Sequence, residues 1–116
     1  MSRLSRREMA KRAVEANWQR TRTMVSLAVT GTSMGDTIPR GSTIEVAFHE
    51  KPRPRRGDII YFRRGELRVA HRLLMAVGPI CVEKGDANRY PGLCLRQSVL
   101  GLVGDVRRRP LAPISE

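Results

Sequence analysis

A serine between flexible residues is the first side chain of the sequence that could act as a nucleophile. Ser33 lies in the run TGTSM (residues 30–34), directly after a segment that alternates like a strand. A free hydroxyl is a poor nucleophile at neutral pH, so a catalytic serine needs a neighbouring base. Most loop serines only cap turns, and Ser33 taken alone is a weak signal.

Four side chains could supply that base: His49, Lys51, His71 and Lys84. His49 and Lys51 lie in or beside a charged segment that we expect to be solvated. His71 differs because it sits within VAHRLL (residues 69–74), among apolar neighbours, where an imidazole can stay neutral and accept a proton. A core histidine with a satisfied hydrogen bond explains the same pattern, and spacing alone favours that alternative.

A carboxylate that could orient the imidazole lies further along the chain. Asp86 stands in KGDAN (residues 84–88), and a third group of this kind fixes the base in a catalytic triad. The alternative is an aspartate that closes a turn by accepting a hydrogen bond from its own backbone.

The N-terminal residues predict a basic amphipathic helix within residues 1–22. Ser5 followed by Glu8 is the pattern of a capping box. The apolar residues form one narrow stripe at helical spacing: Ala10, Val14 and Trp18. The helix could dock on its own domain, lie on an anionic membrane or hold a partner, and the sequence favours the first.

The period then changes to two, which predicts strands. We expect six of them, at residues 24–30, 43–48, 58–63, 67–77, 80–83 and 98–106. Segments rich in Gly, Pro, Asp and Asn separate them, and KPRPRRG (residues 51–57) predicts an exposed loop. The fold class is therefore mainly β: a small coiled-sheet or β-barrel-like domain over residues 23–106, preceded by the helix and followed by a basic tail over residues 107–116.

Taken together and in order, these segments resemble the conserved boxes of type I signal peptidases. GTSMGDTIPRGSTIEV (residues 31–46) is similar to the serine box, and RGDIIYF (56–62) to the box that follows. VAHRLL (69–74) resembles the general-base box of the archaeal and endoplasmic-reticulum subtype, which carries His where the bacterial subtype carries Lys. EKGDAN (83–88) resembles the acidic box, and VLGLVGDV (99–106) the closing strand. Several boxes in order are far more specific than any one of them.

This resemblance implies a serine endopeptidase that cuts a leader or signal peptide and needs no cofactor or metal. Ser33 matches the nucleophile, His71 the general base and Asp86 the orienting acid, whereas Asp58 matches a structural position. The backbone N–H of Ser33 would help to hold the oxyanion, and Thr32 or a backbone group would have to supply the second donor. Family members bind the substrate as an added strand and prefer small side chains just before the cut. The residues expected to line that groove are Val25, Leu27 and Met34.

Some positions depart from the family pattern. Asp36 stands where the family has a proline, and Gly31 where the bacterial relatives have a hydroxyl. These departures leave room for a relative that only binds peptide. Ser-Met-x-Asp also occurs in the SOS-repressor peptidases, which use a Lys base and cut themselves. The VAHRLL segment has no Lys and no Ala-Gly bond precedes Ser33, so self-cleavage is not expected.

Charge supports a second hypothesis. The 116 residues carry 22 Lys+Arg against 11 Asp+Glu, a net charge of +11, and all but three of the cations are Arg, which suits phosphate and carboxylate. A non-catalytic basic β-domain that binds nucleic acid or another anionic partner would explain this excess. Aromatics are only 4% of the chain, and single-strand binders usually stack bases on aromatic rings, so nucleic acid is the less expected partner.

The remaining composition excludes several classes of protein. A hydrophobic content of 41% is too high for a disordered chain, and no apolar stretch approaches the ~20 residues of a membrane span. Without a signal peptide we expect a cytoplasmic protein or one at the periphery of a membrane. Cys81 and Cys94 lack the spacing of a zinc site and are expected as free thiols, with a disulfide possible only in an oxidising compartment.

Overall fold

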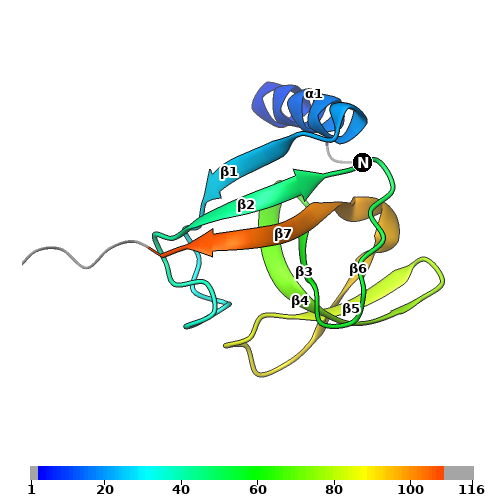
Figure 1. The fold of residues 1–116 in the computed structure, drawn as a ribbon. Helices are drawn as coiled ribbons and strands as arrows, with labels where there is room; N and C mark the ends of the chain where they lie inside the picture. The colour runs from blue at the N-terminus through cyan, green and yellow to red at the C-terminus, as the bar shows by residue number, and fades with distance from the viewer. Residues whose placement is uncertain (1–2, 109–116) are drawn as a thin grey trace, which may run out of the picture.

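In a computed structural model that describes residues 3–108, one helix precedes seven strands in a single antiparallel sheet, coiled into a half-barrel (Figure 1). The mainly β fold class predicted from the sequence is confirmed. The sheet order is β1-β2-β7-β3-β4-β5-β6, so β1 and β6 are its edges. The elements are α1 (Arg6–Thr21), β1 (Met24–Ala28), β2 (Thr43–Phe48), β3 (Ile59–Arg64), β4 (Leu67–Val77), β5 (Ile80–Lys84), β6 (Gly92–Leu95), a 3₁₀ turn (Arg96–Ser98) and β7 (Val99–Arg107).

The alternating sequence of the strands places one side of the sheet in the core. In β2 the side chains of Ile44, Val46 and Phe48 are buried, and the residues between them are half-buried. A second apolar cluster forms around Ile60, Phe62, Leu73, Cys81 and Val99. Burying an aliphatic or aromatic side chain of this size stabilises a fold by roughly 1.5–3 kcal/mol, so the period of two determines which face closes inward.

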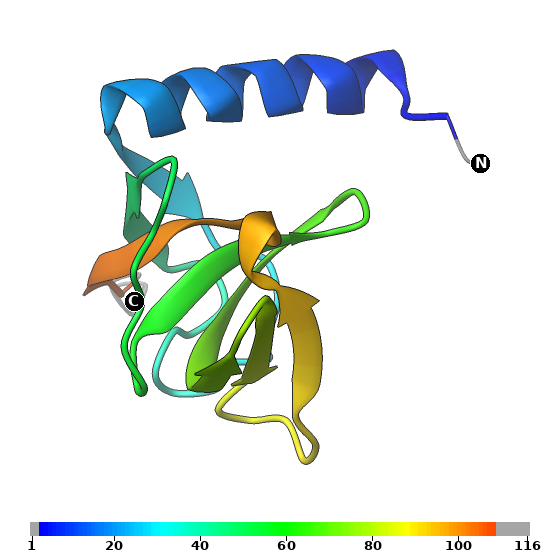
Figure 2. The ribbon, with the colours of Figure 1, turned by 90° about the vertical axis from the view of Figure 1, so that its right-hand side faces the viewer.

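The helix begins as the sequence predicts, because the hydroxyl of Ser5 accepts a hydrogen bond from the backbone N–H of Glu8 at 3.0 Å. The helix covers Arg6–Thr21, inside the predicted range of residues 1–22, and it lies along one side of the coiled sheet (Figure 2). Trp18 packs against Phe48 with ring centroids 5.1 Å apart. Within the described residues, no helix has both the length and the apolar character needed to cross a membrane.

The predicted apolar stripe on this helix is wrong. Ala10 is exposed and Val14 is 47% exposed, whereas Glu8 and Glu15 are buried. Both carboxylates bind the guanidinium of Arg68 on β4. Nη2 of Arg68 lies 2.8 Å from Oε2 of Glu8, and Nε lies 2.7 Å from Oε2 of Glu15. Because Arg68 is buried and must be compensated, the helix turns its acidic face inward, and of the predicted stripe only Trp18 packs on the core.

Two further segments differ from the sequence-based expectation. β6 forms between the predicted strands at residues 80–83 and 98–106, in a segment rich in Gly, Asn and Pro where no strand was predicted, and it pairs with β5. The last strand extends to Arg107, into the expected basic tail, and residues 109–116 of that tail lie outside the described residues. Asp58 closes the turn before β3 by accepting from the N–H of Arg55 at 2.7 Å, as its structural position predicts.

Candidate active site

The structure brings a hydroxyl, an imidazole and a carboxylate into one line. Ser33 lies in the turn that follows β1, His71 in the middle of β4 and Glu83 on β5. The Oγ atom of Ser33 is 2.9 Å from Nε2 of His71. The opposite ring nitrogen, Nδ1, is 2.9 Å from Oε1 of Glu83. In the neutral imidazole, a proton on Nδ1 can be donated to the carboxylate, which leaves Nε2 to accept from the serine hydroxyl.

Strand pairing explains why His71 and Glu83 meet. Leu73 of β4 is the register partner of Glu83 on β5, so His71 and Glu83 are diagonal neighbours on the same face of the sheet. That face is the inner one, where His71 is 6% and Glu83 is 1% exposed. The imidazole also lies edge-on to Phe62, with ring centroids 5.9 Å apart. The ring is therefore confined by packing before any substrate binds.

Backbone contacts hold the serine turn against the loop that follows β5. The carbonyl of Ser33 accepts from the N–H of Ala87 at 2.8 Å, and the N–H of Asp86 donates to the sulfur of Met34 at 3.4 Å. Gly85 makes this approach possible. A Cβ at that position would lie 2.5 Å from the Ser33 carbonyl oxygen and 3.0 Å from Nε2 of His71. Only glycine leaves the serine turn close enough to the imidazole.

Asp86, the carboxylate predicted to orient His71, does not contact it. Its two oxygens accept from Arg72, Nε at 2.9 Å and Nη2 at 2.8 Å, and the hydroxyl of Thr37 donates to it at 2.6 Å. The hydrogen bonds from Arg72 lower the pKa of Asp86, and the bond from Thr37 adds to that effect. β5 ends at Lys84, and Asp86 lies in the turn beyond it, beside Arg72, whereas Glu83 lies within the strand and faces His71. Glu83 therefore replaces Asp86 in the site.

Glu83 was not predicted, because alternation in the sequence ICVEK favours Ile80 and Val82 as the inward residues of this strand. Residues 80–84 alternate between half-buried and buried, and Cys81 and Glu83 are the buried pair. A glutamate at an inward position of a strand needs a partner. The other base candidates are placed elsewhere: His49 accepts from the N–H of Lys51, and the ammonium of Lys84 donates to the carbonyl of Gly85 at 3.3 Å.

Both oxygens of the buried Glu83 carboxylate have partners. While Oε1 faces His71, Oε2 lies 2.9 Å from Nη2 of Arg64, the last residue of β3. Gly92 on the neighbouring strand β6 leaves the space for this group, because a Cβ there would lie 2.9 Å from each carboxylate oxygen. Neither Arg64 nor Gly92 was predicted from the sequence.

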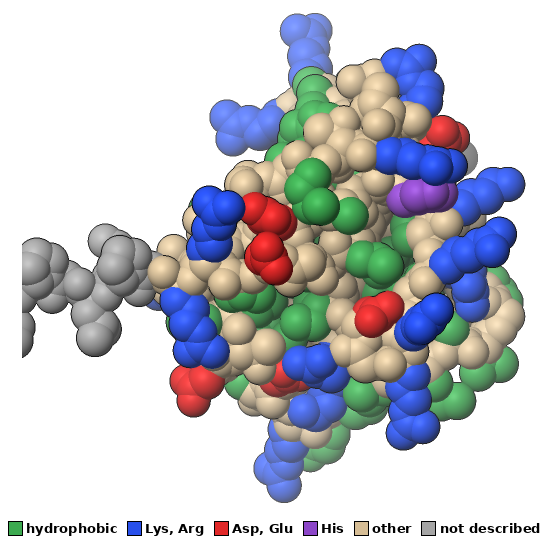
Figure 3. All heavy atoms as spheres, in the orientation of Figure 1, with side chains coloured by type: hydrophobic (Ala, Val, Ile, Leu, Met, Phe, Trp, Pro, Cys, Tyr) green, Lys and Arg blue, Asp and Glu red, His purple; other side chains and the backbone are tan. Residues whose placement is uncertain are grey.

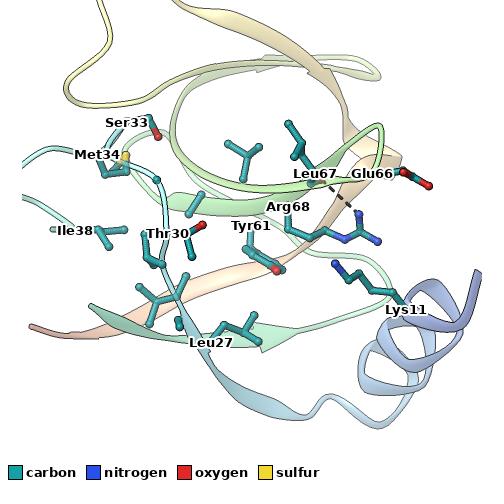
Figure 4. A pocket seen from close by; sticks show the side chains of 16 residues that line it. Lys11, Leu27, Thr30, Ser33, Met34, Ile38, Tyr61, Glu66, Leu67 and Arg68 are labelled. Carbon is teal, nitrogen blue, oxygen red and sulfur yellow. Dashed lines mark hydrogen bonds between the residues drawn. The ribbon is translucent and has the colours of Figure 1, made fainter. Parts of the chain in front are cut away.

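A groove of about 500 Å³ leads away from Ser33. Figure 4 shows Ser33 and Met34 at one end of it and Lys11 of α1 at the other. Two of the three predicted lining residues, Leu27 and Met34, face this groove, whereas Val25 packs on the core instead. Thr32, the predicted oxyanion donor, is exposed and outside the lining, and its carbonyl accepts from the N–H of Gly35.

The long walls of the groove are two unpaired strand edges. Within residues 3–108, β1 pairs only with β2, which leaves its second edge open there. The start of β4 pairs with β3 but meets β5 only from Arg72 onward, so residues 67–70 also have an open edge. Burial raises the pKa of Tyr61 to about 12, so the phenol that lines the groove stays protonated at neutral pH. Open N–H and C=O groups on both sides suit an extended peptide.

Two cysteines lie on the strands β5 and β6, close to Glu83. Cys81 and Cys94 are register partners on β5 and β6, and both thiols are free. Burial raises the pKa of Cys94 to about 12, so its thiol is protonated at neutral pH. Within residues 3–108, no three side chains of His, Cys, Asp or Glu gather closely enough to hold a metal ion.

The geometry meets the requirements of nucleophilic catalysis by serine. The nucleophile lies within hydrogen-bond distance of the base, and the base is oriented by a third group. No protein-family model matches the chain, and neither does any curated protein. A function is therefore inferred from the contacts of Ser33, His71 and Glu83.

Proposed function

We propose that the protein is a serine endopeptidase whose catalytic groups are Ser33, His71 and Glu83. The observation that carries this proposal is the pair of 2.9 Å contacts from Ser33 Oγ to His71 Nε2 and from His71 Nδ1 to Glu83. The proposal also rests on the resemblance of the chain to signal peptidases of the Ser-His subtype. Glu83 takes the place that the resemblance gave to Asp86.

The reaction follows from the direction of the two hydrogen bonds. His71 takes the proton of Ser33 while Oγ attacks the scissile carbonyl, and Glu83 stabilises the imidazolium that forms. The imidazolium then protonates the leaving amine, and an acyl-enzyme remains on Ser33. Water, deprotonated by His71, hydrolyses the ester and restores the free hydroxyl. The backbone N–H of Ser33 is our candidate for the oxyanion donor, with the nearby hydroxyl of Thr32 as a second.

The proposed substrate is an extended peptide, such as a leader or signal peptide. It would lie in the groove as an added strand, between the open edge of β1 and the open edge of residues 67–70. Near Ser33 the groove is lined by Met34, Ile38 and Ala70. These apolar side chains support a preference for small uncharged residues just before the cut.

Cleavage of a peptide library derived from a proteome tests the proposal, with new termini identified by mass spectrometry. Ser33→Ala and His71→Ala should each abolish cleavage while circular dichroism shows the fold unchanged. Glu83→Gln keeps the shape but loses the charge that holds the imidazolium, so kcat should fall by roughly 10³–10⁴-fold. The proposal is wrong if the Ser33→Ala or His71→Ala protein cleaves like the parent.

Asp86→Asn is the matched control, because it makes the same change at the carboxylate three residues away. Asp86 binds Arg72 and Thr37 rather than the imidazole, so this variant should lose less than about tenfold in kcat. A larger loss with Asp86→Asn than with Glu83→Gln would assign the orienting role to Asp86 instead.

A second candidate function is binding of nucleic acid or another anionic partner. The net charge of +11 and the largely exposed loop at residues 51–57 favour it. Figure 3 shows Lys and Arg spread around the rim of one face, with hydrophobic side chains between them. Labelled oligonucleotides test this function, since binding through phosphate contacts should weaken steeply between about 50 and 200 mM salt. Ser33→Ala should not alter that binding.

A further inference from the structure

Arg64 approaches the buried carboxylate of Glu83 from the solvent side. Its Nη2 atom lies 2.9 Å from Oε2 of Glu83 and 3.3 Å from the carbonyl oxygen of Leu93 on β6. The guanidinium carbon lies 5.1 Å from the centre of the Phe62 ring. The Arg64 side chain is 43% exposed while the Glu83 side chain is only 1% exposed. Three contacts therefore hold one partly solvated cation against one buried anion.

A buried carboxylate needs a compensating positive charge, and two groups beside Glu83 can supply it. One is Arg64 on β3, and the other is His71 on β4 once its imidazole is protonated. An imidazolium at His71 satisfies Glu83 equally well, but it can no longer accept the proton of Ser33. Which group compensates Glu83 therefore determines whether the base is available.

The other titratable groups near Glu83 do not change this balance. The thiols of Cys81 on β5 and Cys94 on β6 are free and carry no positive charge. Arg72 of β4 is committed to Asp86 by two hydrogen bonds. Lys84 follows Glu83 directly in β5, so its side chain leaves the opposite face of the strand, and its ammonium donates to the carbonyl of Gly85.

We propose that Arg64 is a positioning residue that compensates the charge of Glu83 and so keeps His71 uncharged and able to act as a base. This inference rests on the proposed roles of Ser33 and His71. Without the charge of Arg64, the buried carboxylate of Glu83 favours protonation of His71, since a hydrogen-bonded ion pair with His71 then neutralises the carboxylate at the lowest free energy. The imidazole then becomes a free base only at higher pH.

An arginine suits this position better than a lysine. Its Nη2 atom donates both to the carboxylate and to the Leu93 carbonyl, and the flat guanidinium lies over the Phe62 ring. Gly92 supplies the space, because a Cβ there would lie 3.1 Å from Nη2 of Arg64. A lysine would supply the charge without a planar group to lie over the Phe62 ring.

Two substitutions separate the charge of Arg64 from its hydrogen bonds. Arg64→Gln keeps a donor without charge, and Arg64→Lys keeps the charge. The readout is the pH midpoint of the His71 ring, followed by NMR of the imidazole nitrogens in the full chain. The protein has two histidines, so His49 in the loop after β2 is an internal reference. Arg107→Met is a control for the loss of one arginine charge elsewhere, because the Arg107 side chain is 72% exposed and pairs with Glu45 on the surface.

With Arg64→Gln, the midpoint of His71 should rise by about one pH unit or more, the size expected when a nearby compensating charge is removed. His49 should not move. Arg64→Lys should return the His71 midpoint most of the way to that of the parent, and Arg107→Met should leave it unchanged. An unchanged or lower His71 midpoint in folded Arg64→Gln protein overturns the proposal, as does an equal rise in Arg107→Met.

Peptide cleavage supplies a second readout that separates this inference from the proposed function. In Arg64→Gln the acid limb of the kcat/KM profile should move to higher pH by the same amount as the NMR midpoint, with the rate recovered on the alkaline side. An equal loss of rate at every pH indicates a merely structural role and counts against the proposal. If no peptide is cleaved at all, the proposed function fails, while the NMR shift still decides the role of Arg64.

Discussion

Two glycines determine how closely the three catalytic candidates approach one another. Gly85 lets the serine turn lie against His71, and Gly92 makes room for the carboxylate of Glu83. Neither position has a positive φ, so the requirement there is for space and not for an unusual backbone conformation. The site therefore depends on the lack of a side chain at Gly85 and Gly92 as well as on the side chains of the three catalytic candidates.

Adding one methyl group at either glycine should separate the groups of the site. In Gly85→Ala the new Cβ displaces the Ser33 carbonyl or the His71 ring, and in Gly92→Ala it displaces Glu83. A shift of about 1 Å in reacting groups can cost about 100-fold in rate, so kcat for peptide cleavage should fall by that order in both variants. Steady-state kinetics beside thermal unfolding measure this effect.

Gly104→Ala in β7 is the control for these substitutions. Its Cβ would lie 3.7 Å from the Glu45 carbonyl oxygen, which is an ordinary contact, and the position is exposed and outside the lining of the groove. This variant should cleave like the parent. Full activity in both Gly85→Ala and Gly92→Ala would show that the site tolerates displacement and would contradict the proposed geometry.

At the scale of the elements, strands were easier to predict than contacts between elements. Alternation located most strands within a few residues, and the Ser5 cap located the helix start. The hydrophobic pattern of α1 did not predict which face of the helix is buried. Arg68 on β4 determines that face, and it lies 53 residues beyond Glu15 in the sequence, so the helix sequence alone does not show it. Glu83 was also missed, since the choice between two nearby carboxylates depends on the register of β4 against β5.

The docking of α1 should depend on pH through Glu8. Hydrogen bonds from Arg68 and then from Arg12 lower the pKa of Glu8 from 4.5 to about 2. Between these values the unfolded chain binds more protons than the folded one, so the stability that Glu8 contributes is complete above about 4.5 and is lost as the pH falls toward 2. Urea unfolding between pH 2 and 6 measures that slope.

Glu8→Gln should remove its own part of the slope, so that the free energy of unfolding changes less with pH in that window. Glu50→Gln, a substitution at an exposed glutamate in the loop after β2, is the control and should keep the slope of the parent. Equal slopes for the parent and Glu8→Gln would show that the ion pair with Arg68 does not hold the helix.

For the whole molecule, the two faces of the sheet formed by β4, β5 and β6 differ in burial but not in apolar character. The inner face holds Leu73 and Cys81 in the core. On the outer face, the register aligns two rows of three apolar side chains, which are exposed or half-buried: Met75, Val82 and Leu93 in one row, and Val77, Ile80 and Leu95 in the other. The composition of the strands does not show which face is buried. Alternation shows which residues share a face, and the register between strands then shows which of them lie in the core.

Substitutions on the two faces should therefore have very different costs. Leu73→Ala removes a side chain that is 1% exposed and leaves a cavity, so the free energy of unfolding should fall by roughly 2–5 kcal/mol. Val77→Thr and Leu93→Thr change side chains that are 60% and 65% exposed, and each should shift it by no more than about 0.5 kcal/mol. Urea unfolding of the three variants at one pH measures both effects. If the substitutions at Val77 and Leu93 cost as much as the one at Leu73, the outer face is covered in solution, and the sheet has an apolar layer on both sides.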